Sequence, residues 1–234
     1  MVRALLLSGG KGTRLGEDIP KQYLKVNGKM LIEYSMETLL ESQEVDSLTI
    51  VSDEAFWDVL SEALKKQKNK DKFNGFVKPG ETRQLSIYNG LLELKRNASE
   101  SDYVLIHDAA RPCLKETMIK KMIDAINGSE GVMPVLPMKD TVYVVDESGK
   151  LKSLLNRKKV VAGQAPELFQ FSEYLNANEK IIKNGRMVSI NGSTEPAFLA
   201  GMNITTIPGD EDNFKITTRE DLERFKGMVD FLSM

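Results

Sequence analysis

Residues 5–24 read LLLSGGKGTRLGEDIPKQYL, and this stretch both sets the fold and points to a ligand. The apolar run Ala4–Leu7 predicts a buried strand, which leads into a glycine-rich loop at Ser8–Arg14. Glycine permits positive φ angles and lets backbone N–H groups approach an anion closely, as loops that hold phosphate require. The cations Arg14 and Lys21 belong to the same stretch. We therefore expect a nucleotide rich in phosphate as the ligand.

The loop differs from the two best-known phosphate-binding loops. It is not a Walker A loop, because no Gly-Lys-Ser or Gly-Lys-Thr follows at the required spacing. It lacks the dinucleotide-binding fingerprint as well, because Leu15 stands where the third glycine belongs. An ordinary strand-to-helix turn with solvated charges is the alternative. The segment Pro20–Tyr23 disfavours that alternative, because Lys21 and Gln22 have no evident packing role directly after a proline.

Composition limits the classes of protein to which the chain can belong. Its 234 residues, 41% hydrophobic and 28% charged, suit one α/β domain with a sizeable core. The net charge of −2 lacks the basic footprint of a nucleic-acid partner. No apolar run approaches the roughly 20 residues that span a bilayer, and no signal peptide precedes the first strand. We expect a cytoplasmic protein with no membrane partner.

The chain has one cysteine and one histidine, which restricts its chemistry. Cys113 alone cannot form an internal disulfide or a cysteine-cluster zinc site, and we interpret it as a half-buried structural thiol. His107 follows an apolar strand, so we expect it to be hydrogen-bonded locally at the strand end. The reaction, if there is one, must proceed without a histidine base.

Strand-like and helix-like segments alternate through the first half of the chain. Expected strands lie at 4–7, 47–51, 73–77, 103–106 and 131–136, and expected helices at 30–40, 54–66, 81–95 and 115–126. This alternation predicts a mostly parallel twisted sheet with helices on both faces. Ligands of such sheets bind beyond the carboxyl ends of the strands. The loops at 8–14, 78–82 and 108–112 all fall there, so we expect them to share one site.

The pattern changes after Pro137. Thr141–Val145 alternates like a half-exposed strand, Asp146–Lys150 is a turn signal, and Leu151–Leu155 continues as a second strand. We expect this hairpin to protrude as an arm at about 139–158 from a single domain that spans 1–234. The chain then resumes with a helix at 172–183, a strand at 204–207 and a helix at 219–232.

These residues resemble the cytidylyltransferase family that includes the 2-C-methyl-D-erythritol 4-phosphate and ribitol-5-phosphate enzymes. The resemblance spans nearly the whole chain, because the motifs occur in the family's order: GGKGTR, PKQYL, PGETRQLSIYNGL, VLIHDAARP, PVLPMKDTV and DNFKITTREDL. It implies a Rossmann-like nucleotidyltransferase fold and transfer of CMP from CTP to a phosphorylated alditol, with Mg²⁺ as the cofactor. It also implies a homodimer with interlocking arms.

The same resemblance assigns roles to individual positions. It implies catalytic roles for Arg14, Lys21 and Lys215. It implies that the nucleotide is bound by Leu7, Ser8, Gly9, Gly10, Lys11, Gly12, Thr13, Gly80, Glu81, Arg83, Ser86, Asp108 and Ala109. It implies that the alditol phosphate is bound by Thr141, Arg157, Ser193 and Thr194. Asp108 is the one implied metal ligand, and Arg111 is implied to be a structural anchor.

The implied chemistry agrees with the shortage of histidine. A phosphate monoester has a second pKa of about 6, so it is already a dianionic nucleophile near neutral pH. Attack on the α-phosphorus of CTP then needs positioning and charge neutralisation by Lys, Arg and Mg²⁺ and no general base.

The identity of the alditol phosphate stays open at this stage. Ala165–Glu167 stands where relatives usually have Thr-Pro-Gln, which favours the ribitol phosphate enzymes, and Ser193–Glu195 is a second departure. Ala109–Pro112 is closer to the methylerythritol enzymes, which we place slightly ahead. Two other classes remain as alternatives: a sugar-1-phosphate nucleotidyltransferase that uses UTP or GTP, and an inactive nucleotide-binding regulator. The Asp-Ala-Ala-Arg-Pro segment disfavours the first, and the combination of Arg14, Lys21 and Lys215 disfavours the second.

Overall fold

The apolar run at the amino terminus forms β1 (Val2–Leu7), which is buried along its whole length. The burial follows from its place in the sheet, because parallel neighbours flank it on both sides, β4 (Ser47–Val51) and β6 (Tyr103–Asp108). The next strand, β5 (Phe73–Val77), is parallel to β4. This computed structural model describes residues 1–10, 19–186, 189–190 and 192–232.

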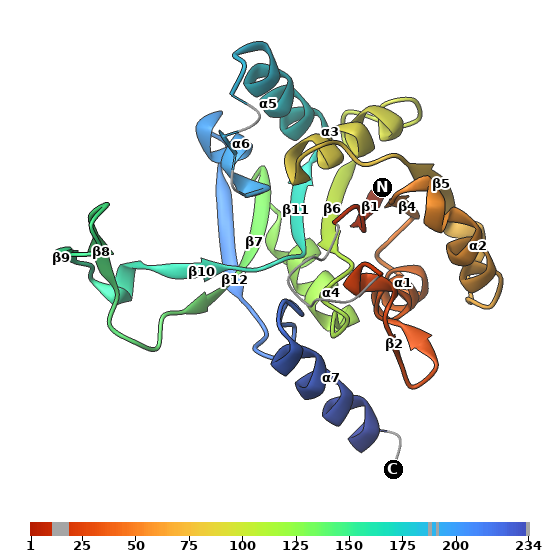
Figure 1. Ribbon diagram of the computed structural model, residues 1–234. Helices are drawn as coiled ribbons and strands as arrows, with labels where there is room; N and C mark the ends of the chain where they lie inside the picture. Colours follow the sequence, from red (N-terminus) through yellow and green to blue (C-terminus); the bar gives the residue numbers. More distant parts are fainter. Residues whose placement is uncertain (11–18, 187–188, 191, 233–234) are drawn as a thin grey trace.

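The main sheet has eight strands in the described ranges, in the order β10-β7-β11-β6-β1-β4-β5, with β12 also paired to β7 (Figure 1). β7 (Gly131–Pro137) and β12 (Ile204–Pro208) are parallel to each other. β10 (Val161–Gly163) and β11 (Glu167–Gln170) run antiparallel to their neighbours. The mostly parallel sheet predicted from the sequence is confirmed. β10 and β11 were not predicted, because runs of three and four residues are too short to show a period.

Helices cover both faces of the sheet. On one face, α1 (Leu31–Glu41), α2 (Trp57–Lys65) and α4 (Glu116–Ala125) pack on inward side chains such as Leu6 and Ile50. On the other, α3 (Arg83–Leu94), α5 (Phe171–Lys183) and α6 (Thr194–Leu199) pack on side chains such as Leu5 and Val51. Successive residues of β1 thus serve opposite cores, as strand geometry dictates.

Local capping explains where two helices begin. The expected helix at 81–95 starts at Arg83, because the hydroxyl of Thr82 accepts a hydrogen bond from the Leu85 N–H at 3.1 Å. The expected helix at 54–66 divides into a 3₁₀ turn at Glu54–Phe56 and α2, with Asp53 capping the turn. α7 (Arg219–Leu232) packs through Leu222 and Phe225 against Leu31 and Ile216. Within the described ranges, no helix has both the length and the apolar composition needed to cross a bilayer.

The predicted hairpin forms a separate two-stranded sheet, β8 (Tyr143–Val145) with β9 (Leu151–Leu154). It lies away from the main sheet, at the left of Figure 1. We expected it to be half-exposed, but every residue of both strands is exposed, because within the described chain the two strands pair only with each other. A smaller hairpin, β2 (Lys25–Val26) and β3 (Lys29–Met30), precedes α1.

Candidate functional site

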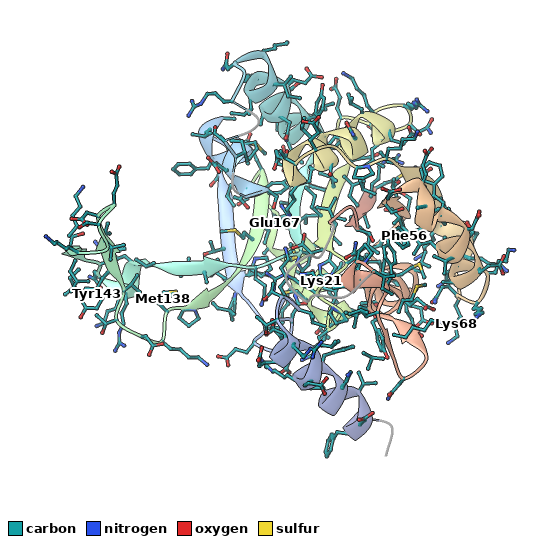
Figure 2. All side chains as sticks on the ribbon, viewed as in Figure 1. Lys21, Phe56, Lys68, Met138, Tyr143 and Glu167 are labelled. Atoms are coloured by element: carbon teal, nitrogen blue, oxygen red, sulfur yellow. The ribbon has the colours of Figure 1, made fainter. Side chains whose placement is uncertain are left out.

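A cleft of about 670 Å³ opens where the parallel strands β1, β4 and β6 end. It brings together the three loops that the sequence pointed to. Its lining comprises Leu7, Ser8, Gly9, Gly10, Lys21, Gln22, Asp53, Pro79, Gly80, Glu81, Thr82, Arg83, Ser86, Asp108, Ala110 and Lys215. The lining includes most of the residues expected to bind a nucleotide. Lys21, which also lines the cleft, is labelled near the middle of Figure 2. Lys11, Gly12, Thr13 and Arg14 lie outside the described residues.

Glycine is required at two points of the cleft wall by close contacts. A Cβ atom on Gly9 would lie 2.4 Å from the Cβ of Pro79, and one on Gly80 would lie 2.4 Å from the Cβ of Leu85. The neighbouring Gly10 has open space around it instead. The first glycine loop and the 79–80 loop therefore approach each other more closely than any side chain at Gly9 would allow.

Gln22 has a structural role that the sequence analysis did not recognise. Its amide Nε2 donates hydrogen bonds to the carbonyl oxygens of Ser8 at 2.7 Å and Gly10 at 2.8 Å, and its side chain is buried. Next to it, the Tyr23 hydroxyl accepts a hydrogen bond from the Ser8 hydroxyl at 2.9 Å, and the Tyr23 ring stacks on Phe56. The expectation that Gln22 lacks a packing role is therefore wrong. The side chain of Gln22 holds two carbonyl groups of the glycine loop in place.

Asp108 is the centre of charge in the cleft. Its Oδ1 accepts hydrogen bonds from Arg83 Nε at 3.1 Å and Nη2 at 3.0 Å, and its Oδ2 accepts one from Lys215 Nζ at 2.9 Å. Burial by itself would raise the pKa of Asp108, but the nearby charges of Arg83 and Lys215 outweigh it and hold that pKa well below its usual range. The carboxylate is thus ionised, and the two cations are fixed at the cleft wall.

The floor of the cleft is held by buried side chains around Asp108. The ring Nε2 of His107 lies 3.0 Å from the carbonyl oxygen of Arg111, and burial lowers the pKa of His107 to about 4. This is the local hydrogen bond expected for that histidine. Arg111 in turn donates to the carbonyl oxygen of Asn213 at 2.8 Å, which ties the 108–112 loop to the segment that carries Lys215. Such a contact fits the expected anchoring role.

Two further residues that were expected to bind the nucleotide make hydrogen bonds to backbone groups. Ala109 is buried and donates its N–H to the Leu7 carbonyl oxygen at 3.0 Å, so it extends the strand pairing behind the cleft. The Ser86 hydroxyl accepts from the Gly80 N–H at 3.0 Å and donates to the Thr82 carbonyl oxygen at 2.9 Å. Ser86 therefore shapes the 80–82 turn that lines the cleft.

The residues expected to bind the alditol phosphate lie in two places. Thr141 and Arg157 belong to the exposed arm, and neither lines the cleft of its own chain. The Arg157 Nη1 donates to the Lys139 carbonyl oxygen at 2.8 Å. Ser193 and Thr194 direct their hydroxyls to the carboxylate of Glu167, a buried residue at the start of β11. The sequence marked Glu167 only as a departure from related proteins.

The described part of the chain contains no group of three or more His, Cys, Asp or Glu side chains able to hold a metal ion. Asp108 is a single carboxylate already engaged by cations. Magnesium, however, commonly takes one or two carboxylates, several waters and the phosphates of its substrate. The donor set therefore suits a metal that arrives on a nucleotide and not one held by protein ligands alone.

Comparisons with known proteins point to one family. The model of the family described as IspD: 2-C-methyl-D-erythritol 4-phosphate cytidylyltransferase matches residues 2–230. The enzyme of that name from Clostridium botulinum is 35% identical over 222 residues, covering 95% of this chain and 96% of the relative. The ribitol-5-phosphate cytidylyltransferase of Streptococcus agalactiae is 30% identical over 230 residues, covering 97% of this chain and 94% of the relative.

Solved structures agree on the fold. The 4-diphosphocytidyl-2C-methyl-D-erythritol synthase of Anaerococcus prevotii matches with a TM-score of 0.85 at 24% identity, covering 98% of this chain and 96% of that one. The 2-C-methyl-D-erythritol 4-phosphate cytidylyltransferase of Francisella tularensis matches with a TM-score of 0.81 at 25% identity, covering 97% and 98%.

Proposed function

The chain belongs to the 2-C-methyl-D-erythritol 4-phosphate cytidylyltransferase family, and from that membership we propose its reaction. It transfers CMP from CTP to 2-C-methyl-D-erythritol 4-phosphate, releases pyrophosphate and forms a CDP-alditol used for isoprenoid precursors. The observation that carries the proposal is the pairing of Lys215 and Arg83 on Asp108 in the wall of a cleft closed by a glycine loop.

The reaction is a single in-line displacement. An oxygen of the alditol phosphate forms a bond to the α-phosphorus of CTP, and the bond from that phosphorus to the bridging oxygen of the β-phosphate breaks as pyrophosphate leaves. The attacking phosphate is already ionised near neutral pH, so no side chain has to remove a proton. His107 could not do so readily, because it is fully buried and engaged with a backbone carbonyl.

Cations supply most of the catalysis in such a displacement. Lys215 stands at the cleft wall, where its ammonium would neutralise charge on the α-phosphate. Lys21 lies across the same cleft and, with Arg14, would hold the triphosphate. Backbone N–H groups of Gly9 and Gly10 would cradle the phosphates, as glycine loops do.

The base and ribose of CTP would lie against other lining residues of the cleft. Ser8 and Gly80 contribute a small side chain and a backbone turn suited to a pyrimidine, beside Leu7 and Glu81. Arg83 and Ser86 also line the cleft. Asp108 would contribute to a Mg²⁺ ion bound mainly by the phosphates, and that ion would supply further charge neutralisation when bound.

The arm would complete the second substrate's pocket in a homodimer. The apolar side chains of Leu151 and Leu154 on β9 are 70% and 64% exposed, which is unfavourable for an isolated hairpin. Packing on a second copy of the chain would bury them and bring Thr141 and Arg157 to the partner's cleft. The planar guanidinium of Arg157 suits a phosphate group better than a lysine would.

Ribitol 5-phosphate is the second candidate for the alditol phosphate. It is favoured by the ribitol-5-phosphate cytidylyltransferase relative, which matches across 97% of this chain. It is also favoured by the unusual Ala165–Glu167 segment beside the cleft. Either substrate leaves the nucleotide chemistry unchanged.

A pyrophosphate-release assay tests the proposal. The purified chain is given CTP, UTP, ATP or GTP with Mg²⁺, and either alditol phosphate. We expect release with CTP and 2-C-methyl-D-erythritol 4-phosphate, at a kcat/KM more than tenfold above that for ATP or GTP. Turnover of ribitol 5-phosphate alone would reverse the choice of substrate. CTP binding without release of pyrophosphate from CTP in the presence of either alditol phosphate would indicate a regulator.

A further inference from the structure

Glu167 is a buried carboxylate that the proposed reaction does not use. It begins β11, which runs antiparallel to β6 with Glu167 opposite Ile106. Because the strands are antiparallel, the first residue of β11 lies at the sheet edge where β6 ends in Asp108. Glu167 therefore stands directly behind the cleft, near the centre of Figure 2, with its side chain 10% exposed.

Within the described chain, the groups that contact this carboxylate can all donate a hydrogen bond to it. The hydroxyl of Ser193 donates to Oε2, the hydroxyl of Thr194 donates to Oε1 at 2.9 Å, and Arg83 Nη2 lies 4.0 Å from Oε2. All three groups can donate to a carboxylate oxygen. Burial raises the pKa of Glu167 above its usual value, and the charge of Asp108 adds to the rise, while the charge of Arg83 and the two hydroxyls act against it.

These contacts connect Glu167 to the charged residues of the cleft. Lys215 binds Asp108, Asp108 binds Arg83, and the Arg83 Nη2 that donates to Asp108 also lies 4.0 Å from Glu167 Oε2. The guanidinium of Arg83 thus lies near two carboxylates, while a third of its side chain stays exposed. Because a guanidinium is planar, two carboxylates near its Nη2 restrict the orientation that it presents to a ligand.

The hydroxyls that hold Glu167 are themselves fixed by buried side chains. The Tyr174 hydroxyl donates to the carbonyl oxygen of Ser193 at 2.6 Å. Gln84, next to Arg83 on α3, donates to Asn178 of α5 at 2.5 Å. The helix that carries Arg83 and the segment just before α6 that carries Ser193 are therefore both held by side chains of α5.

We propose that Glu167 is a positioning residue that orients Arg83 for the nucleotide, while Ser193 and Thr194 hold its carboxylate. This inference rests on the proposed function, because it takes CTP as the ligand of the cleft. It gives Ser193 and Thr194 a role through Glu167 and not through contact with the alditol phosphate.

The sign of one measurement separates positioning from a plain charge effect. Removing a negative charge near a phosphate site strengthens phosphate binding if only the net charge matters. Removing a side chain that orients Arg83 weakens binding instead. The variant Glu167→Gln keeps the size of the side chain and removes its charge, so the direction of the change in affinity is decisive.

The first experiment measures CTP binding by isothermal titration calorimetry in the presence of Mg²⁺. We expect Glu167→Gln to raise the Kd for CTP about tenfold, while kcat at saturating substrates stays within about threefold. Glu173→Gln, which removes the same charge from an exposed position on α5, should leave the Kd unchanged. If Glu167→Gln unfolds, Glu167→Asp replaces it, since a shortened carboxylate should raise the Kd in the same direction. Tighter or unchanged binding would overturn the inference.

A double-mutant cycle tests the route through Arg83. If Glu167 acts through Arg83, Glu167→Gln should have little further effect on the Kd in an Arg83→Gln background. Full additivity would overturn the proposed route. The double variant Ser193→Ala, Thr194→Val should raise the Kd for CTP in the same direction as Glu167→Gln. A raised KM for the alditol phosphate with an unchanged Kd for CTP would return those residues to substrate binding. Failure of the unmodified protein to bind CTP would instead refute the proposed function.

Discussion

The cleft and the arm at 139–158 differ in where their side chains find partners. Around the cleft, Arg83 and Lys215 both pair with Asp108 of the same chain. On the arm, every residue of β8 and β9 is exposed, and the two strands pair only with each other in the described chain. The cleft that we propose for the nucleotide is therefore assembled by one chain. The arm has the form of a structure that needs a second surface.

The largest effect should come from the cation at the cleft wall. Lys215→Ala should lower kcat about 100-fold or more, because it removes a charge that stabilises the transition state. The fold should persist, since Asp108 keeps Arg83 as a partner. Steady-state kinetics with circular dichroism measure both. Lys226→Ala is the control and should retain full activity, because Lys226 is a half-exposed lysine on α7 that pairs with Glu223 and does not line the cleft. Near-normal turnover in Lys215→Ala would remove that residue from the mechanism.

The next effect tests the close contact between the two loops of the cleft. Gly9→Ala should raise the Kd for CTP about 30-fold, because the new methyl group would overlap Pro79 and push the loops apart. Gly227→Ala on α7 is the control, because a methyl group there also meets open space and the residue does not line the cleft. The two variants are compared by titration calorimetry. Equal affinities would show that the contact does not set the shape of the site.

A change in the arm should affect the KM for one substrate and not kcat or CTP binding. Arg157→Lys should raise KM for the alditol phosphate about tenfold and leave KM for CTP nearly unchanged, because only the alditol phosphate would meet the arm. Initial-rate kinetics with each substrate varied in turn provide the measurement. A similar rise in both KM values would mean that the arm also serves the nucleotide. Sedimentation should show a dimer at micromolar concentration, and a fully active monomer would contradict the shared pocket.

The smallest effect concerns the buried floor of the cleft. The pKa of His107 is about 4 in the folded chain against 6.5 in the unfolded chain, so the unfolded chain binds more protons between those values. The contribution of His107 to the free energy of unfolding is therefore largest above pH 6.5 and is lost as the pH falls toward 4. Between pH 6.5 and 5.5 the loss should be about 1 kcal/mol.

Urea unfolding at each pH measures that loss. His107→Gln keeps a donor for the Arg111 carbonyl oxygen and removes the titrating ring, so its stability should fall less over the same interval. All other titrating groups are shared, and the difference between the two proteins reports His107 alone. Parallel curves would show that His107 is protonated as easily in the folded chain as in the unfolded one.

The sequence predicted the parts of the fold that rest on long periodic segments. The apolar runs at 47–51 and 73–77 became strands with the expected bounds. The described part of the glycine loop, the 78–82 loop and Asp108 line one cleft, as expected. This worked because parallel strands place their carboxyl ends together whatever the details of packing. The motifs in family order also predicted the family that the comparisons show.

Features that depend on tertiary contacts were not predictable. β11 and its Glu167 are buried only because β6 and β7 enclose them, and nothing in four residues shows this in advance. Gln22 showed no evident packing role in the sequence, because its two acceptors are carbonyl oxygens of a loop more than ten positions away. The pairing of Arg83 with Asp108 likewise joins residues 25 positions apart.

The pairing of Asp108 with two cations makes ligand binding an exchange of counter-ions. A phosphate that enters the cleft must compete with a resident carboxylate for Lys215 and Arg83, so its gain is the difference between two ion pairs. A doubly charged phosphate wins that competition more easily than a singly charged or neutral group of the same shape. The cleft should therefore discriminate by charge state before it discriminates by shape.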